Sequence, residues 1–288
     1  MTSPKIWFVT GASSGLGAAL CCAVIARGDC LVAGARRTER LQPLRDLAPD
    51  RVLTLPLDLT NEGSRQSAID AAETRFGRID VLANVAGRGI NGAGEELSSA
   101  QLRQAFELNF FGTVELTRAV LPGMRRRRSG HILSVTSICG LVSIPDLGAY
   151  SASKFALEAW MEALAGEIED LGLRCTLVEP GAFRTEFEGD KIIRPLNRIP
   201  DYAPLIGPIE ASLSAHAGSQ PGDPDRAAEV IVRAVEAPHS PMRLILGSDA
   251  HAMLQAHLGQ LKADIARWRS EGLATDFPQE CHPSDLRA

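Results

Sequence analysis

Short apolar runs alternate with longer helical stretches along most of this chain of 288 residues. Strands are expected near residues 5–10, 30–35, 52–57, 79–84, 131–136, 173–178 and 243–246. Helices are expected near residues 15–27, 38–47, 62–76, 99–123, 150–171, 225–237 and 248–270. The strand runs carry few charges, as strands covered on both faces do. The alternation therefore predicts an α/β fold with a doubly wound parallel sheet and helices on both faces.

A glycine-rich turn with the spacing T-G-x-x-x-G-x-G follows the first expected strand, at residues 10–17. Backbone N–H groups at such a turn, together with the positive end of the next helix, can hold a pyrophosphate. Glycine is needed because a Cβ would block the approach of the backbone. The residues expected to contact a dinucleotide here are Gly11, Ser13, Ser14, Gly15, Leu16 and Gly17.

A second set of residues points to proton transfer. Tyr150 precedes Lys154 by four positions, so a helix would place both on one face. Ser137 follows an apolar run that reads as a strand ending at the same cleft. A phenol is a weak acid at neutral pH, and a nearby cation is expected to lower its pKa. The set suits interconversion of a carbonyl and an alcohol, which also needs a source of hydride.

Together these segments resemble the short-chain dehydrogenase/reductase family, in its single-domain, non-extended branch and its hydroxysteroid- and retinol-dehydrogenase-like group. The matching segments are residues 10–17, 58–60, 84–87, Asn109, Ser137, 150–154 and 180–181. The resemblance implies a Rossmann-type sheet of about seven strands in the order 3-2-1-4-5-6-7. It also implies one domain over residues 1–288.

The end of the second expected strand bears on the choice of cofactor. NAD-preferring Rossmann domains usually place an acidic residue there, on the ribose hydroxyls. This chain has Ala35 followed by Arg36 and Arg37, and arginine suits a phosphate group. The sequence therefore predicts NADP(H), with Arg36 as the leading contact. The alternative is that the two arginines only cap the turn.

Other cofactor contacts are implied by the resemblance. Val85 departs mildly from the family's frequent N-N-A-G, whereas Asn84 is expected to pin the strand end. The implied contacts are Asp58, Leu59, Asn84, Ala86, Gly87, Tyr150, Lys154, Pro180, Gly181, Phe183 and Thr185.

The resemblance also implies the catalytic roles. Tyr150 would exchange a proton with the substrate oxygen, and Ser137 would hold that oxygen. Lys154 would lower the pKa of Tyr150 and bind the nicotinamide ribose. Asn109 would support a water relay to Lys154; the alternative for Asn109 is a satisfied polar group inside a helix.

Residues 186–224 are rich in proline and glycine and are expected to form the substrate-binding loop, with short helical pieces near 188–193 and 208–216. The apolar side chains of this loop favour a hydrophobic carbonyl substrate. Residues 248–288 are expected to form a helical extension that covers the cleft or joins a subunit contact. The alternative for the loop is a plain surface insertion.

Composition narrows the possible partners. A net charge of −5 gives no indication of nucleic-acid binding, and the basic run Arg125–Arg128 is expected to be a solvated helix end. No apolar stretch is long enough to span a membrane, and six cysteines without metal-ligand spacing fit a cytoplasmic protein. A homodimer or homotetramer is expected, through the helices at 99–123 and 150–171.

Two other functions remain open at this point. A 3-oxoacyl thioester reductase would need a basic patch for its carrier, with Arg184 and the run at 125–128 as candidates. A non-catalytic NADP sensor would be expected to have lost the tyrosine or the lysine. Epimerases and dehydratases of the extended branch carry T-G-x-x-G-x-x-G and a larger C-terminal domain, which this chain does not have.

Overall fold

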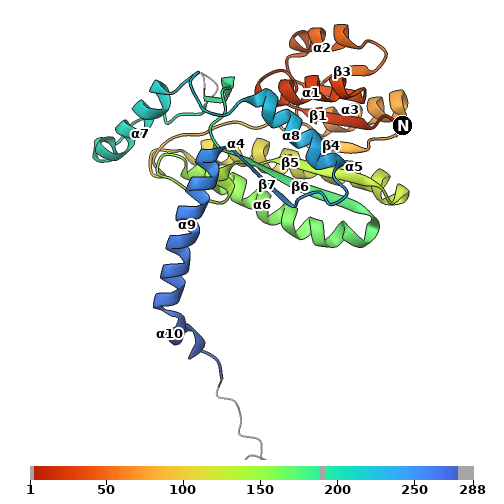
Figure 1. The fold of residues 1–288 in the computed structure, drawn as a ribbon. Coiled ribbons are helices and arrows are strands. Elements are labelled where there is room, and N and C mark those ends of the chain that lie inside the picture. Colours follow the sequence, from red (N-terminus) through yellow and green to blue (C-terminus); the bar gives the residue numbers. More distant parts are fainter. Residues whose placement is uncertain (1–2, 189–191, 278–288) are drawn as a thin grey trace, which may run out of the picture.

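Seven parallel strands form one sheet in the computed structural model, which describes residues 3–188 and 192–277 (Figure 1). Their order is β3-β2-β1-β4-β5-β6-β7, as expected from the sequence. The strands are β1 (Ile6–Thr10), β2 (Cys30–Ala35), β3 (Val52–Pro56), β4 (Val81–Asn84), β5 (Gly130–Val135), β6 (Leu173–Pro180) and β7 (Arg243–Leu246). The predicted Rossmann-type fold is therefore confirmed.

Helices cover both faces of the sheet. One face packs against α1 (Gly15–Arg27), α2 (Gln42–Leu47) and α8 (Pro224–Glu236). The other packs against α3 (Glu62–Phe76), α5 (Thr113–Arg127) and α6 (Gly148–Ile168). Short turns of 3-10 helix lie at η1 (Thr38–Leu41), η3 (Ile138–Gly140) and η4 (Glu169–Leu171).

The two hydrophobic layers follow from the alternation of side chains along each strand. In β1, Trp7 and Val9 point into the layer beneath α1 and α8, whereas Phe8 points into the opposite layer. All three are fully buried. Apolar residues at successive positions are thus required, because each face of the sheet has its own core.

The helix expected at 99–123 is divided. It consists of α4 (Ser99–Phe106), a π-helical segment η2 (Glu107–Gly112) and α5. Gly112 packs so closely on Leu59 that a Cβ would come within 2.9 Å of that residue. The expected helix is present, but the sequence did not predict its π-helical segment, and a π-helical turn often marks a functional site.

The loop at 186–224 also differs from expectation. It contains η5 (Glu186–Glu188), η6 (Pro200–Tyr202) and α7 (Ala203–Ala215). The helical piece expected at 208–216 is present as α7, which begins five residues earlier. Pro204 near the start of α7 fits the first turn of a helix, where its missing N–H costs nothing. The piece expected at 188–193 meets only the end of η5. Residues 189–191 lie outside the described residues.

The C-terminal helix α9 (Ser248–Arg267) starts beside the body of the protein and then extends away from it (Figure 1). Ala250 is buried, but Ile265 is 60% exposed and Trp268 is 66% exposed. A short helix α10 (Arg269–Leu273) follows, and the expected extension beyond residue 277 lies outside the described part. Within the residues described, no helix is both long enough and apolar enough to cross a membrane.

Candidate active site

A large cleft of about 1540 Å³ opens at the carboxyl edge of the sheet. Ligands of open α/β sheets bind at this edge, because the loops after parallel strands meet there. Residues that follow β1, β2, β3, β4, β5 and β6 all line the cleft. Of the residues expected from the sequence to contact cofactor or substrate, only Asn84 and Asn109 do not line it.

The turn after β1 is shaped for a close backbone approach. Gly11 has φ 68°, and a Cβ there would lie 2.9 Å from Cα of Ala86. A Cβ on Gly17 would lie 2.3 Å from the carbonyl oxygen of Gly11. Thr10 ties this turn to the end of β4, since its Oγ1 accepts hydrogen bonds from the N–H groups of Val85 (2.9 Å) and Ala86 (3.1 Å). The cradle fits a dinucleotide pyrophosphate at the start of α1.

Positive and negative side chains lie at the far end of the cleft. Arg36 and Arg37 line it directly after β2. Asp58, after β3, accepts hydrogen bonds at Oδ1 from the N–H (3.0 Å) and the hydroxyl (2.7 Å) of Thr60. These bonds hold the pKa of Asp58 below its usual value, and the charge of Arg36 adds to the effect. Asp58 is therefore a carboxylate at neutral pH.

Asn84 does not line the cleft but supports the strand end next to it. Its Nδ2 donates to the hydroxyls of Thr117 (3.0 Å) and Ser134 (3.2 Å). It therefore pins the end of β4 to α5 and β5, as expected. Ala86 and Gly87, farther along, line the cleft itself.

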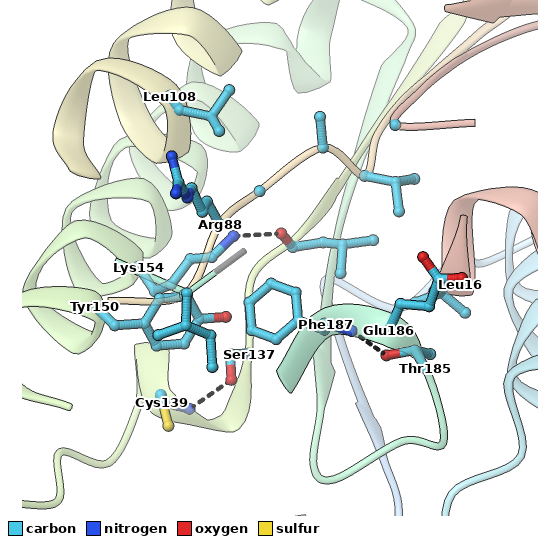
Figure 2. A pocket seen from close by; sticks show the side chains of 18 of the residues that line it. Leu16, Arg88, Leu108, Ser137, Cys139, Tyr150, Lys154, Thr185, Glu186 and Phe187 are labelled. Atoms are coloured by element: carbon cyan, nitrogen blue, oxygen red, sulfur yellow. Dashed lines mark hydrogen bonds between the residues drawn. The ribbon is translucent and has the colours of Figure 1, made fainter. Parts of the chain in front are cut away.

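Ser137, Tyr150 and Lys154 converge on the inner wall of the cleft (Figure 2). Ser137 contacts the Tyr150 hydroxyl through a side-chain hydrogen bond, and its Oγ accepts from the N–H of Cys139 at 3.1 Å. Lys154 Nζ lies 5.9 Å from the centre of the Tyr150 ring and donates to the carbonyl oxygen of Val135 at 3.0 Å. All three residues are buried.

The pKa of Tyr150 does not follow the sequence-based expectation. Burial raises it above its ordinary value, with a smaller opposing effect from the Ser137 hydrogen bond. Lys154 does not offset this, because its ammonium group points to Val135 rather than to the phenol oxygen. Burial also lowers the pKa of Lys154, to about 8. The predicted lowering of the Tyr150 pKa is therefore wrong in this structure, and the phenol keeps its proton at neutral pH.

Asn109 is fully buried in the π-helical segment η2. Its Oδ1 accepts from the N–H of Arg88 at 2.9 Å, and its Nδ2 donates to the Arg88 carbonyl oxygen at 3.0 Å. Nδ2 also donates to the Ser153 hydroxyl at 3.1 Å. The side chain thus fixes the loop after β4 against α6, one residue before Lys154.

The segment after β6 closes the other side of the cleft. Pro180, Gly181, Phe183 and Thr185 line it, and Thr185 lies against Gly15. Sequence reasoning missed Asp249, whose Oδ2 accepts from the N–H of Ala182 at 2.7 Å. Its position in the first turn of α9, two residues after Gly247, was the available signal.

Apolar side chains lie beside Tyr150 in the cleft. The ring of Phe187 lies 5.8 Å from that of Tyr150 (Figure 2), and Ile192 lines the same region. Cys139 is buried and also lines the cleft. Ile193 pairs with the loop after β4: its N–H donates to the carbonyl oxygen of Gly89, and its carbonyl oxygen accepts from the N–H of Asn91. The segment at 186–224 therefore does lie over the cleft.

The basic run at 125–128 lies elsewhere. It ends α5 just before β5 begins, and so occupies the amino edge of the parallel sheet. Arg127 and Arg128 donate to the carbonyl oxygens of Ile79 and Asp170. Among the residues described, no group of histidine, cysteine and acidic side chains has the geometry of a metal site.

A family model described as short chain dehydrogenase matches residues 5–193, so the chain belongs to the short-chain dehydrogenase/reductase family. The chain is 34% identical to "Oxidoreductase BOA17" of Botryotinia fuckeliana, over 94% of this chain and 99% of the relative. It is also 34% identical to human "Retinol dehydrogenase 8", over 84% of this chain and 81% of the relative.

Solved structures agree with this assignment. A short-chain dehydrogenase from Streptomyces avermitilis is 41% identical, with a TM-score of 0.89 over 95% of this chain and 99% of that one. An alcohol dehydrogenase from Thermococcus sibiricus, complexed with 5-hydroxy-NADP, is 27% identical, with a TM-score of 0.69 over 85% and 96% of the two chains. Similar structures carry either an NADP derivative or NAD. The protein is thus an oxidoreductase of a family that binds nicotinamide nucleotides.

Proposed function

We propose that this protein is an NADP(H)-dependent oxidoreductase that interconverts a hydrophobic carbonyl compound and its alcohol. The observation that carries the proposal is the convergence of Ser137, Tyr150 and Lys154 in one buried wall of the cleft. The glycine cradle lines the same cleft, and its volume of about 1540 Å³ leaves room for a dinucleotide. Cytoplasmic location and a homo-oligomeric state are part of the same proposal.

Each of the three side chains has its own role in the proposed reaction. Tyr150 holds its proton at neutral pH because burial raises its pKa, so it can donate that proton to a carbonyl oxygen during reduction. Ser137 orients the same oxygen through its hydroxyl. Lys154 would supply a positive charge to this wall of the cleft and would bind the ribose hydroxyls of the nicotinamide nucleotide. Asn109 is a positioning residue, because its side chain fixes the loop after β4 rather than reaching the cleft.

The cofactor assignment is supported by the shape and charge of the cleft. When bound, NADP(H) supplies or accepts the hydride. The residues after β1 would hold its pyrophosphate, and Asp58 and Leu59 would lie beside its adenine. Arg36 and Arg37 would face the 2′-phosphate, since no acidic residue lines the cleft at the end of β2.

The substrate class is supported by Phe187 and Ile192 beside Tyr150. A relative named retinol dehydrogenase agrees with a hydrophobic substrate. A 3-oxoacyl thioester reductase is less well supported, because the basic run at 125–128 lies at the opposite edge of the sheet.

The test is NADPH consumption with steroids, retinal, quinones, β-ketoesters and acyl thioesters, with a parallel NADH series. Tyr150→Phe should reduce turnover by at least about a hundredfold, since it removes the proton donor. It should leave NADPH binding, followed by fluorescence, within about twofold, because the ring and Lys154 remain.

Wild-type turnover of a hydrophobic class, lost in the variant, is the expected result. Retained turnover in Tyr150→Phe would overturn the assignment of the proton donor. Tight NADPH binding without turnover of any class would favour a nucleotide sensor.

A further inference from the structure

A buried acidic pair lies beneath the active-site wall, outside the residues that the reaction itself uses. Glu158 is on α6, one turn after Lys154, and Glu179 is the residue before Pro180 at the end of β6. The side chain of Glu158 is 5% exposed and that of Glu179 is fully buried. Acidic residues are rarely buried to this extent unless they are paired.

Both carboxyl groups share one guanidinium. Arg243, the first residue of β7, donates from Nη1 to Glu158 Oε2 at 2.6 Å and to Glu179 Oε1 at 2.7 Å. Its Nη2 contacts Glu162 at 2.5 Å, but the Glu162 side chain is 65% exposed. Two buried acids thus face one cation, and the third acid is solvated.

Besides Arg243, the two carboxyl groups contact each other, and Glu158 also contacts the hydroxyl of Thr136. Glu158 Oε1 and Glu179 Oε2 are both buried away from solvent. Two buried acids beside one cation are best satisfied when one proton is shared between them. Burial, followed by the charge of Glu158, accordingly raises the pKa of Glu179 to about 7.

The pair lies next to Lys154. A Cβ on Gly140 would meet Glu158 Cγ at 3.0 Å and Lys154 Cβ at 3.4 Å, so both side chains pass the same glycine. Glu158 favours the charged form of Lys154 and partly offsets the effect of burial. On the cleft side, Cys139 and Tyr150 stay neutral because burial raises the pKa of each.

We propose that Glu158, Glu179 and Arg243 form a buried charge unit that keeps Lys154 protonated near neutral pH. Arg243 and Glu179 hold Glu158 in place, so all three are positioning residues for Lys154. Glu162 shares the guanidinium but is not part of the unit. The catalytic consequence rests on the proposed function, whereas the charge of Lys154 can be measured without turnover.

The composition of the chain makes that measurement direct, because the sequence contains four lysines: Lys5, Lys154, Lys191 and Lys262. Protein labelled with ¹³C at lysine Cε therefore gives four resonances, and Lys154→Met identifies the buried one. Its titration in the wild type is expected near pH 8.

Three matched amide variants test the unit. Glu158→Gln should lower the Lys154 midpoint by about one pH unit, because it removes the nearest negative charge. Glu179→Gln should lower it by a smaller amount, since that carboxyl acts from farther away. Glu162→Gln should leave it unchanged, and Glu158→Asp, which keeps the charge, should stay close to the wild type.

An unchanged midpoint in Glu158→Gln would overturn the proposal, as would an equal shift in Glu162→Gln. If Glu158→Gln does not fold, the comparison of Glu179→Gln with Glu162→Gln decides, and equal midpoints in those two would overturn it. Where the enzyme turns over a substrate, the alkaline limb of kcat/KM should move with the Lys154 midpoint. A midpoint that shifts without turnover in any protein would support the charge unit and reject only the proposed function.

Discussion

Several side chains around the cleft bind backbone groups of distant segments rather than ligand. The Asn109 amide accepts from the N–H of Arg88 and donates to its carbonyl oxygen, and Asp249 accepts from the N–H of Ala182. Breaking such a buried hydrogen bond is costly, because the polar group left behind would stay desolvated without a partner. At the residue scale, the geometry of the site therefore depends on polar side chains that hold the backbone around it.

Arg36 gives the sharpest prediction at this scale. The double variant Ala35→Asp, Arg36→Leu replaces a phosphate-binding cation with a carboxylate, which would repel a 2′-phosphate and bind ribose hydroxyls. The ratio of kcat/KM for NADPH to that for NADH should fall by at least about a hundredfold. Arg40→Leu is the control, because Arg40 is paired with Glu186 at 3.2 Å. An unchanged ratio in the double variant would reject Arg36 as the phosphate contact.

At the scale of elements, the loop at 186–224, proposed to bind substrate, is anchored by the segment before α4. Glu96 accepts from the N–H of Ile199 at 2.8 Å and from Arg198 Nη1 at 2.9 Å. Its side chain is only 2% exposed, and these bonds keep its pKa below the ordinary value. Tyr202 adds a second contact, to Glu95 at 2.7 Å. The loop is thus anchored to the segment before α4 at residues 198–202.

Glu96→Gln should weaken this attachment of the loop. We expect KM for the carbonyl substrate to rise about tenfold, since a charge-assisted bond is lost, with kcat changed by less than about threefold. Glu95→Gln is the matched control and should alter KM by no more than about twofold. A fall in kcat with KM unchanged would mean that Glu96 acts on the chemistry instead of on the loop.

At the scale of the whole molecule, the two long helical segments proposed for subunit contact carry both buried and exposed apolar residues. Leu116, Leu157 and Leu164 on these segments are buried in the core beneath α5 and α6. Phe111 on η2 is 47% exposed and Phe155 on α6 is 42% exposed. The proposed interface therefore depends on these two aromatic residues.

Phe155→Asp places a charge in the proposed interface and should convert the oligomer to single chains, measured by light scattering after size exclusion. Leu196→Asp is the control, because Leu196 is 90% exposed on the substrate loop. A wild-type protein that already has the mass of one chain would contradict the homo-oligomer, and an unchanged mass in Phe155→Asp would move the interface elsewhere.

Local patterns in the sequence determined the sheet and the position of the site. Parallel strands buried on both faces must be apolar throughout, and the turn after β1 requires glycine at Gly11 and Gly17 because the backbone approaches too closely for a Cβ. The same locality explains why α1 and α3 were predicted with their observed bounds. Periodicity and turn chemistry act over a few residues, so they can be read without the fold.

Only the tertiary structure decided the electrostatics of the site. The direction of the Tyr150 pKa depends on how completely the surrounding elements exclude water and on where Lys154 points. The meeting of Glu158, Glu179 and Arg243 brings together three elements far apart in the chain. The π-helical segment at Asn109 and the departure of α9 from the body are likewise set by packing. Burial and charge are properties of neighbours in space, and a linear pattern does not specify those neighbours.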